Sequence, residues 1–217
     1  MLKKLIKPYY NSYKLITNKH PYRAYNKKYE CIFIHIPKTA GTSILKLLNN
    51  NKIPRYHGFW FEYQKRSPHC FNDYYKFSFV RNPWDRTVST FFYLRKLIEN
   101  SNTAFIPKNL AKYETFDDFV NLFLNKDTIW SHKLFIPQWF FILDQDDILK
   151  VDFLGKIESI EEDFDIIKSN FKNYPIGNLK KINSSHRKLY KDYYTNETKT
   201  KIAELYSKDI KFFDYEF

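Results

Sequence analysis

Cysteines and long apolar runs are scarce in this sequence of 217 residues, and these shortages exclude several classes of protein. Cys31 lies in a short apolar stretch and Cys70 lies beside His69, so the chain has neither a disulfide framework nor the cysteine spacing of a metal site. The N-terminal residues include lysines but no apolar segment of signal-peptide or membrane-spanning length. We therefore expect a cytoplasmic protein that binds no metal, with Cys31 as a structural free thiol.

The length and composition of the chain favour one folded domain. Hydrophobic residues make up 43% of the sequence and aromatic residues 20%, which is too rich for a disordered protein. A single core in a chain of this length buries about 70% of the surface that the unfolded chain exposes. We find neither an internal repeat nor a low-complexity linker. The sequence predicts a basic N-terminal segment at 1–28 and one domain at 29–217.

Positive charge is in excess along the whole chain. The formal net charge is +12 and the isoelectric point is near 9.4. Such a chain attracts polyanions without specific recognition, and nucleic acid, anionic lipid, nucleotide phosphates and acidic polysaccharide all meet that condition. The basic N-terminal segment is a candidate for peripheral contact with a membrane. Charge alone, however, identifies no ligand.

Strand-like and helix-like patterns alternate along the sequence. Apolar runs predict three strands, at 29–36, 75–80 and 151–157. Helix patterns are found at 43–50, 82–100 and 196–213. Asn82 is the expected N-cap of the second of these helices and Pro83 its first residue, while capping-box spacings begin at Thr115 and Ser159. The alternation predicts an α/β fold with a central parallel sheet flanked by helices.

Candidate anion-binding residues gather between the first strand and the first helix, in the stretch HIPKTAGTS at 35–43. Backbone N–H groups at a helix N-terminus favour an anion. Gly41 allows the backbone to approach closely, Lys38 adds a mobile positive charge, and hydroxyl donors come from Thr39, Thr42 and Ser43. An ordinary N-cap turn is the alternative, but the combination favours a phosphate or sulfate cradle. The lysine precedes the glycine, so the pattern is not a Walker P-loop.

Two long segments, FIHIPKTAGTS and FSFVRNPWDRTVSTFFYL, resemble the signature segments of the carbohydrate sulfotransferases that use 3′-phosphoadenosine 5′-phosphosulfate (PAPS). These are the Golgi glycan sulfotransferases and their microbial relatives. The segments occur in the family's order, and weaker similarity extends from about residue 30 to the C-terminus. The resemblance implies a nucleotide-kinase-like fold that binds PAPS and transfers its sulfuryl group to a hydroxyl of a glycan. The positive charge favours an acidic glycan.

The resemblance also assigns donor-binding roles to individual residues. The family's 5′-phosphosulfate loop corresponds to Lys38, Thr39, Ala40, Gly41, Thr42 and Ser43. Lys38 would neutralise charge on the bridging oxygen as the sulfuryl group leaves. The family's 3′-phosphate ligands correspond to Arg81, at the carboxyl end of a strand, and Ser89, on the following helix. A segment that closes over the nucleotide in relatives corresponds to Ser184, Ser185 and Arg187, where a solvated basic loop is an equal alternative.

Two arginines compete for the role of phosphate ligand. The planar guanidinium of Arg81 suits a phosphate. Arg86 lies three positions before Ser89 on the same helix face and is a rival, with a surface ion pair as the alternative. Ser89 lies about 10 Å further along the helix axis, so its convergence with Arg81 rests on the resemblance.

Sulfuryl transfer requires a general base to take the proton of the attacking hydroxyl. His57 is the first candidate, because it lies between the two signature segments where glycan sulfotransferases often place a catalytic histidine. His69, in the same connecting region, is the second. His132 is a candidate contact of the acceptor or the nucleotide, and His35 is expected to be structural. The residues expected to stack on acceptor sugars are Tyr56, Trp60 and Tyr63.

Two other functions fit parts of the same pattern. An ATP-dependent phosphotransferase would need acidic magnesium ligands near the phosphate loop, for which Asp85 and Asp152 are candidates, although neither ends an apolar strand. A nonenzymatic module that binds RNA or another polyanion fits the charge and the aromatic residues. No recognition motif for nucleic acid is present, and the anion-binding features concentrate at two strand ends.

Overall fold

The structure is a computed structural model that describes residues 21–49, 56–101, 106–107, 110–173, 176–179 and 188–217. The chain forms two compact units. The first contains Met1–Ile36, Gly41–Phe79 and Phe140–Lys180. The second contains Pro37–Ala40, Val80–Trp139 and Lys181–Phe217. Most of the N-terminal segment predicted at 1–28 lies outside the described residues, and the predicted division at residue 29 stays a prediction.

A three-stranded parallel sheet forms the centre of the first unit, which confirms the predicted α/β class. The strands are β1 (Cys31–Ile34), β2 (Tyr75–Val80) and β3 (Phe153–Lys156), in the order β1-β2-β3. The pairing of β1 with β2 is parallel and runs from Cys31 opposite Tyr75 to Ile34 opposite Ser78. The first strand is shorter than predicted because Tyr29 ends a helix, α2 (Ala24–Tyr29).

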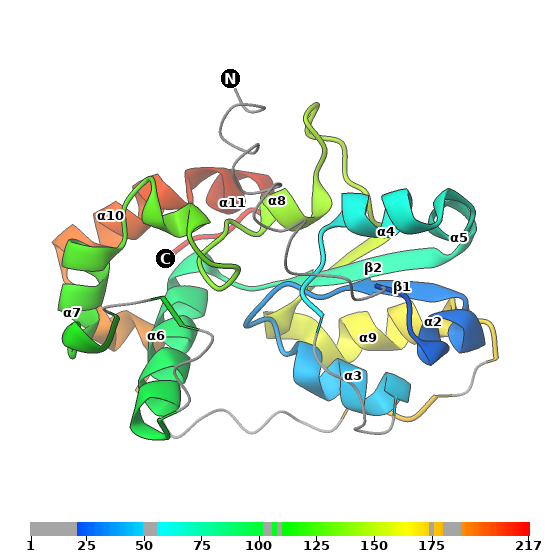
Figure 1. The fold of residues 1–217 in the computed structure, drawn as a ribbon, viewed down its shortest axis with the longest axis horizontal. Coiled ribbons are helices and arrows are strands. Elements are labelled where there is room, and N and C mark those ends of the chain that lie inside the picture. Colours follow the sequence, from blue (N-terminus) through cyan, green and yellow to red (C-terminus); the bar gives the residue numbers. More distant parts are fainter. Residues whose placement is uncertain (1–20, 50–55, 102–105, 108–109, 174–175, 180–187) are drawn as a thin grey trace. The chain divides into compact units, whose positions relative to one another are not determined.

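Helices cover both faces of this sheet (Figure 1). On one face lie α2, α3 (Gly41–Asn49) and α9 (Ile160–Ser169), and on the other lie α4 (Trp60–Arg66) and α5 (Pro68–Asp73). Alternate side chains of the strands point to the first face, because successive residues of a strand face opposite sides. The core there contains Cys31, Phe33, Phe77, Phe79, Ile44, Leu48, Phe164 and Ile167. As predicted, Cys31 is a buried free thiol, and burial raises its pKa.

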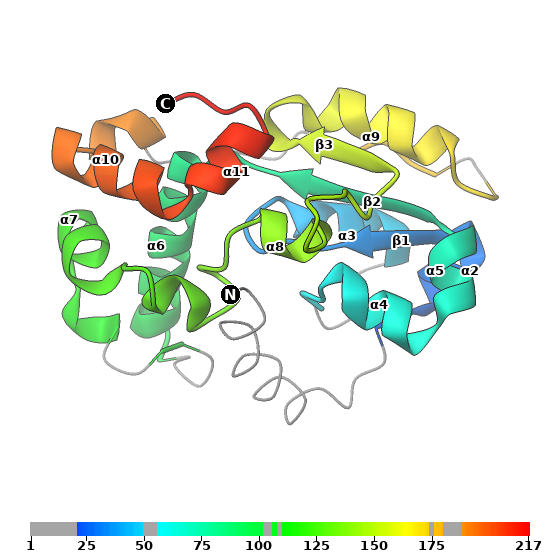
Figure 2. The ribbon, with the colours of Figure 1, turned by 90° about the horizontal axis from the view of Figure 1, so that it is seen from above.

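The second unit is helical and packs around α6 (Pro83–Glu99), as Figure 2 shows. Asn82 begins α6 as predicted, because its side chain accepts the N–H groups of Trp84 and Asp85 and Pro83 occupies the first helical position. The other helices are α7 (Phe116–Asp118), η2 (Phe119–Phe123), α10 (Asn196–Leu205) and α11 (Ser207–Phe212). The described residues also form the short elements α8 (Trp139–Ile142), η1 (Leu110–Lys112), η3 (Thr128–Trp130), η4 (Ile157–Ser159) and η5 (Tyr190–Tyr193).

One predicted capping box and the continuity of one predicted helix are wrong, although Ser159 is the N-cap of α9 as expected. Thr115 caps α7 as expected, but Ser159 makes no capping hydrogen bond and its hydroxyl donates instead to Asp163 at 2.8 Å. The helix predicted at 196–213 is two helices, because Tyr206 leaves the helical conformation with φ −113° and ψ 25°. No helix in the described part of the chain has both the length and the apolar composition to cross a bilayer.

Candidate functional site

The turn that follows β1 has an unusual backbone at Pro37–Ala40. Lys38 and Ala40 have positive φ angles of 70° and 54°, whereas Thr39 between them does not. Alternating φ signs of this kind turn successive backbone N–H groups toward one side, which favours an anion. The conformation is unfavourable for residues other than glycine, so surrounding contacts must hold it.

Arg81, the first residue after β2, provides one of these contacts. Its Nη1 donates to the carbonyl oxygen of Lys38 at 3.2 Å, and its Nε donates to Oδ2 of Asp85 at 2.8 Å. The ion pair connects Arg81, which precedes α6, to Asp85 in the first turn of that helix. Lys38, predicted to bind the 5′-phosphosulfate of PAPS, and Arg81, predicted to bind its 3′-phosphate, are therefore in direct contact.

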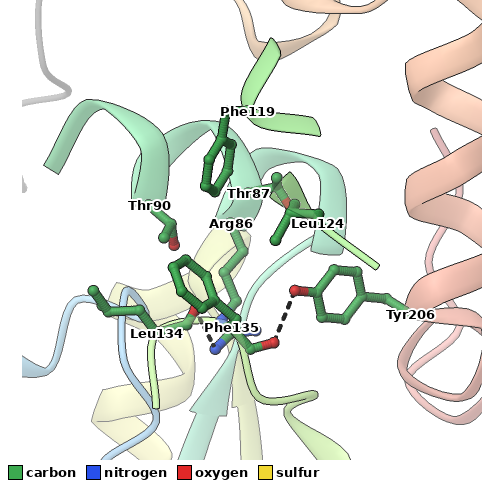
Figure 3. Close-up of a pocket in the computed structure, with 8 residues that line it drawn as sticks. All are labelled: Arg86, Thr87, Thr90, Phe119, Leu124, Leu134, Phe135 and Tyr206. Atoms are coloured by element: carbon green, nitrogen blue, oxygen red, sulfur yellow. Dashed lines mark hydrogen bonds between the residues drawn. The ribbon is translucent and has the colours of Figure 1, made fainter. Parts of the chain in front are cut away.

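Arg86 is neither a surface residue nor part of an ion pair with an acidic side chain among the described residues, so its predicted surface ion pair is wrong. It is 3% exposed, and its Nε donates to the carbonyl of Pro37 at 3.1 Å. Figure 3 shows its side chain reaching past Phe135 toward the carbonyl of Leu134, to which Nη2 donates at 3.3 Å. Arg86 lines a small pocket together with the other residues labelled in Figure 3, and this pocket has no room for a water molecule. Burial lowers the pKa of the Arg86 guanidinium, which here braces the start of the turn.

Tyr93 holds the side chain of Lys38. The ammonium nitrogen lies 4.2 Å from the centre of the Tyr93 ring, two turns further along α6 than Arg86. A cation over an aromatic face is attracted to the ring's electron density. No sequence pattern points to Tyr93, because only the fold brings this face of α6 beside the turn.

Two further residues without a signal in the sequence, Gln138 and Asp209, support the backbone of Arg81. Gln138 binds the backbone of Arg81 with both ends of its side-chain amide. Asp209 on α11 is fully buried and accepts the N–H groups of Gln138 and Trp139, both at 2.8 Å. Burial raises the pKa of Asp209 to about 6, although these N–H groups and Arg86 favour the charged form.

In the first unit, Gly41 begins α3 beneath the ring of His35. An added Cβ at Gly41 would lie 1.9 Å from Nε2 of His35, which is far inside contact distance. A residue without a side chain is thus needed at position 41 because the imidazole of His35 occupies the space, in addition to the close approach of an anion that the sequence predicts. The hydroxyl residues Thr42 and Ser43 are half-buried on the first turn of α3, whereas Thr39 of the second unit is fully buried.

His57 lies against His35 in the same unit. Nδ1 of His57 is 3.0 Å from the carbonyl oxygen of His35, and the two rings are 4.2 Å apart between centroids. A carbonyl oxygen only accepts, so Nδ1 carries the proton in the neutral imidazole and Nε2 has the lone pair. This is the tautomer that a general base acting through Nε2 needs. His35 lies after β1 rather than inside a strand as expected.

The other predicted site residues lie in different surroundings. The side chain of His69 is 85% exposed on α5, where its Nδ1 contacts the carboxylate of Asp73, which is typical of a solvated surface histidine. His132 accepts the N–H of Leu134 at 3.2 Å. Ser89 is half-buried on α6, and the described residues show no hydrogen bond between it and Arg81. Ser184, Ser185 and Arg187 lie outside the described residues.

The aromatic residues expected near the acceptor are mainly part of the packing. Tyr63 is 1% exposed and its hydroxyl donates to the carbonyl of Phe33 at 3.3 Å, so it is too buried to stack on a sugar. Trp60 is partly exposed, but its Nε1 donates to the carbonyl of Leu143. Tyr56 is partly exposed beside His57 in the sequence and remains the best placed of the three.

The two carboxylates considered as magnesium ligands both form ion pairs with basic side chains. Asp85 pairs with Arg81 as described above, and Asp152 pairs with Lys76 Nζ at 2.8 Å and also accepts the Lys76 N–H. Among the described residues, no three histidine, cysteine or acidic side chains cluster in a way that would hold a metal ion. The phosphotransferase alternative therefore gains no support from these residues.

Comparison with known families identifies the family of the chain. A family model described as the sulfotransferase family matches residues 23–216, almost the whole chain. The chain belongs to the sulfotransferase family. This membership confirms the resemblance at the level of the family, whose members are transferases.

Individual relatives add little detail to this family assignment. An uncharacterized protein of Archaeoglobus fulgidus is 29% identical over 93 residues, which are 43% of this sulfotransferase chain and 63% of the archaeal protein. The chain thus spans less than two thirds of the length of that relative. No solved structure matches the sequence.

Proposed function

We propose that the chain transfers the sulfuryl group of PAPS to a hydroxyl of a carbohydrate acceptor. Family membership supports sulfuryl transfer, and the residues present fit the donor nucleotide. The observation that carries the proposal is the hydrogen bond from Arg81 to the carbonyl of Lys38. It joins the turn after β1 to the turn after β2, which supports a site where one anionic molecule contacts both a lysine and an arginine.

In this proposal the second unit holds the donor. The backbone N–H groups at Lys38–Ala40 bind the 5′-phosphosulfate, and Lys38 neutralises the bridging oxygen as the S–O bond breaks. Arg81 binds the 3′-phosphate through donors that its contacts with Asp85 and Lys38 do not use. Arg86 binds no ligand and keeps the turn in place through Pro37.

The acceptor hydroxyl would lose its proton to Nε2 of His57. The carbonyl of His35 fixes the required tautomer. The formal charge of +12 favours an acidic polysaccharide as acceptor. An assay with radiolabelled PAPS and crude polysaccharides tests this part, and label transferred only to phenols or amines would exclude a carbohydrate acceptor.

Thermal unfolding with added nucleotides tests the donor. At a concentration 100 times its Kd, 3′-phosphoadenosine 5′-phosphate should stabilise the protein by about 2.7 kcal/mol, which corresponds to a rise in Tm of about 5–10 °C. Arg81→Met should lose this rise, whereas Arg66→Met, at an exposed site on α4, should keep it. A larger rise with ATP and magnesium would instead support a phosphotransferase.

A further inference from the structure

Gln138 binds the backbone of Arg81 through both polar atoms of its side chain. The Arg81 N–H donates to Oε1 at 3.0 Å, and Nε2 donates to the Arg81 carbonyl at 2.8 Å. In a β-sheet, a residue of a neighbouring strand forms the same pair of hydrogen bonds, one to the N–H and one to the carbonyl of its partner residue. β2 ends at Val80, so the amide of Gln138 continues the pairing for one residue beyond the strand.

Gln138 is itself fixed in place. It is fully buried, and its own N–H donates to Asp209 at 2.8 Å. The other oxygen of the Asp209 carboxylate accepts the N–H of Trp139. A carboxylate that accepts two adjacent backbone N–H groups at the start of α8 sets the direction of the preceding side chain. The chain of contacts therefore runs from Asp209 through Gln138 to the backbone of Arg81.

The guanidinium of Arg81 is held separately from its backbone. Asp85 accepts from Nε and the Lys38 carbonyl accepts from Nη1. In the part of the chain that the structure describes, Nη2 of Arg81 has no protein acceptor. Because both the backbone and two guanidinium nitrogens are fixed, the direction of Nη2 is fixed as well.

We propose that Gln138 is a positioning residue whose amide fixes the backbone of Arg81, so that the guanidinium is aimed at the 3′-phosphate of the donor nucleotide. The inference rests on the proposed function, because it assigns that phosphate to Arg81. It adds a requirement for an amide at this position. Glutamate would lose the donor to the Arg81 carbonyl, and methionine of similar length would lose both bonds.

Nucleotide selectivity tests the inference. The affinity of the protein for 3′-phosphoadenosine 5′-phosphate is compared with its affinity for 5′-AMP, which lacks the 3′-phosphate. Gln138→Met should reduce the preference for the first nucleotide by about tenfold and leave the affinity for 5′-AMP nearly unchanged. Gln64→Met, at an exposed site on α4, is the matched control and should keep the full preference.

A double-mutant cycle separates positioning from general loss of structure. In an Arg81→Met background, Gln138→Met should cause no further loss of selectivity, because its effect passes through Arg81. Additive losses in the two variants would overturn the inference. If Gln138→Met does not fold, Gln138→Glu takes its place in the cycle. Amide exchange in the unmodified protein is a further measurement: it should slow at Arg81 with 3′-phosphoadenosine 5′-phosphate and not with 5′-AMP.

The outcomes distinguish this inference from the function on which it rests. Equal affinity of the unmodified protein for both nucleotides contradicts the proposed function. A clear preference for the 3′-phosphate that Gln138→Met retains contradicts only the role of Gln138. Exchange at Arg81 that responds equally to both nucleotides also contradicts that role.

Discussion

Lys38 shows how much a single residue contributes to the turn after β1. Its backbone has a positive φ angle, its carbonyl accepts a hydrogen bond from Arg81, and its ammonium group lies over Tyr93. The first two features belong to the backbone and survive replacement of the side chain. Substitution therefore separates the charge of Lys38 from the shape of the turn.

Lys38→Ala should lower kcat by about 10²–10³-fold, because one preorganised donor to the developing negative charge is lost. Binding of 3′-phosphoadenosine 5′-phosphate should weaken much less, since this product has no bridging oxygen to a sulfuryl group. Steady-state kinetics and calorimetry measure the two effects. Lys46→Ala, at an exposed site on α3, is the control and should match the unmodified protein. A Lys38→Ala variant with normal kcat would remove Lys38 from the mechanism.

The two histidines proposed as the base make opposite predictions. His57→Ala should lower kcat by about 10²–10⁴-fold, as expected for loss of a general base, whereas His69→Ala should have little effect because its ring is in solvent. The pH dependence of kcat for both variants is the measurement. The reverse order of effects would assign the base to His69.

At the scale of elements, the join between β1 and α3 depends on a glycine. Gly41→Ala should lower the free energy of unfolding by about 1–3 kcal/mol, because the new methyl group overlaps the ring of His35. Chemical denaturation measures the change. Gly177→Ala is the control, since an added Cβ there would meet Leu47 at an ordinary 3.6 Å.

Removing the ring of His35 provides a second check of this overlap. In a His35→Ala background, Gly41→Ala should be tolerated, so that the two substitutions together destabilise the protein less than the sum of their separate effects. Additive effects would show that the imidazole is not the obstacle.

The sequence was informative where local patterns determine structure. The second strand and the cap at Asn82 are as predicted, because an apolar run and an Asn-Pro start are local signals. The break in the last predicted helix was missed, because it lies at Tyr206, whose hydroxyl reaches the carbonyl of Phe135 from a distant part of the chain.

The candidate site was predicted only in part for the same reason. Lys38 and Arg81 stand out in sequence as charged residues after apolar strands. Gln138 and Asp209 carry no such signal, since their roles come from contacts 57 and 71 residues apart in the chain. Arg86 was misjudged because its partners are backbone carbonyls, which no sequence pattern reveals.

At the scale of the whole molecule, Asp209 links folding to pH. Its pKa is raised from 3.8 to about 6 in the folded state, so between these values the folded protein holds more protons than the unfolded one. The stability that protonated Asp209 contributes is fully present below about pH 4. It is lost as the pH rises through 6.

Comparison with Asp209→Asn isolates this effect. Relative to the variant, the free energy of unfolding of the unmodified protein should fall by about 3 kcal/mol from pH 4 to pH 7, because each pKa unit corresponds to about 1.4 kcal/mol. Denaturation at several pH values provides the measurement. Asp192→Asn, at an exposed site, should run parallel to the unmodified protein. If stability depends on pH in the same way for Asp209→Asn and the unmodified protein, the ionisation of Asp209 does not contribute to folding stability.

The alternating backbone at Lys38–Ala40 has a consequence for the thermodynamics of binding. Arg81 and Arg86 secure this turn through the carbonyls of Lys38 and Pro37, which are contacts within the chain. An arriving anion therefore meets donors that are already aimed, and little conformational entropy is lost on association. Calorimetry should accordingly show a favourable enthalpy with only a small opposing entropy.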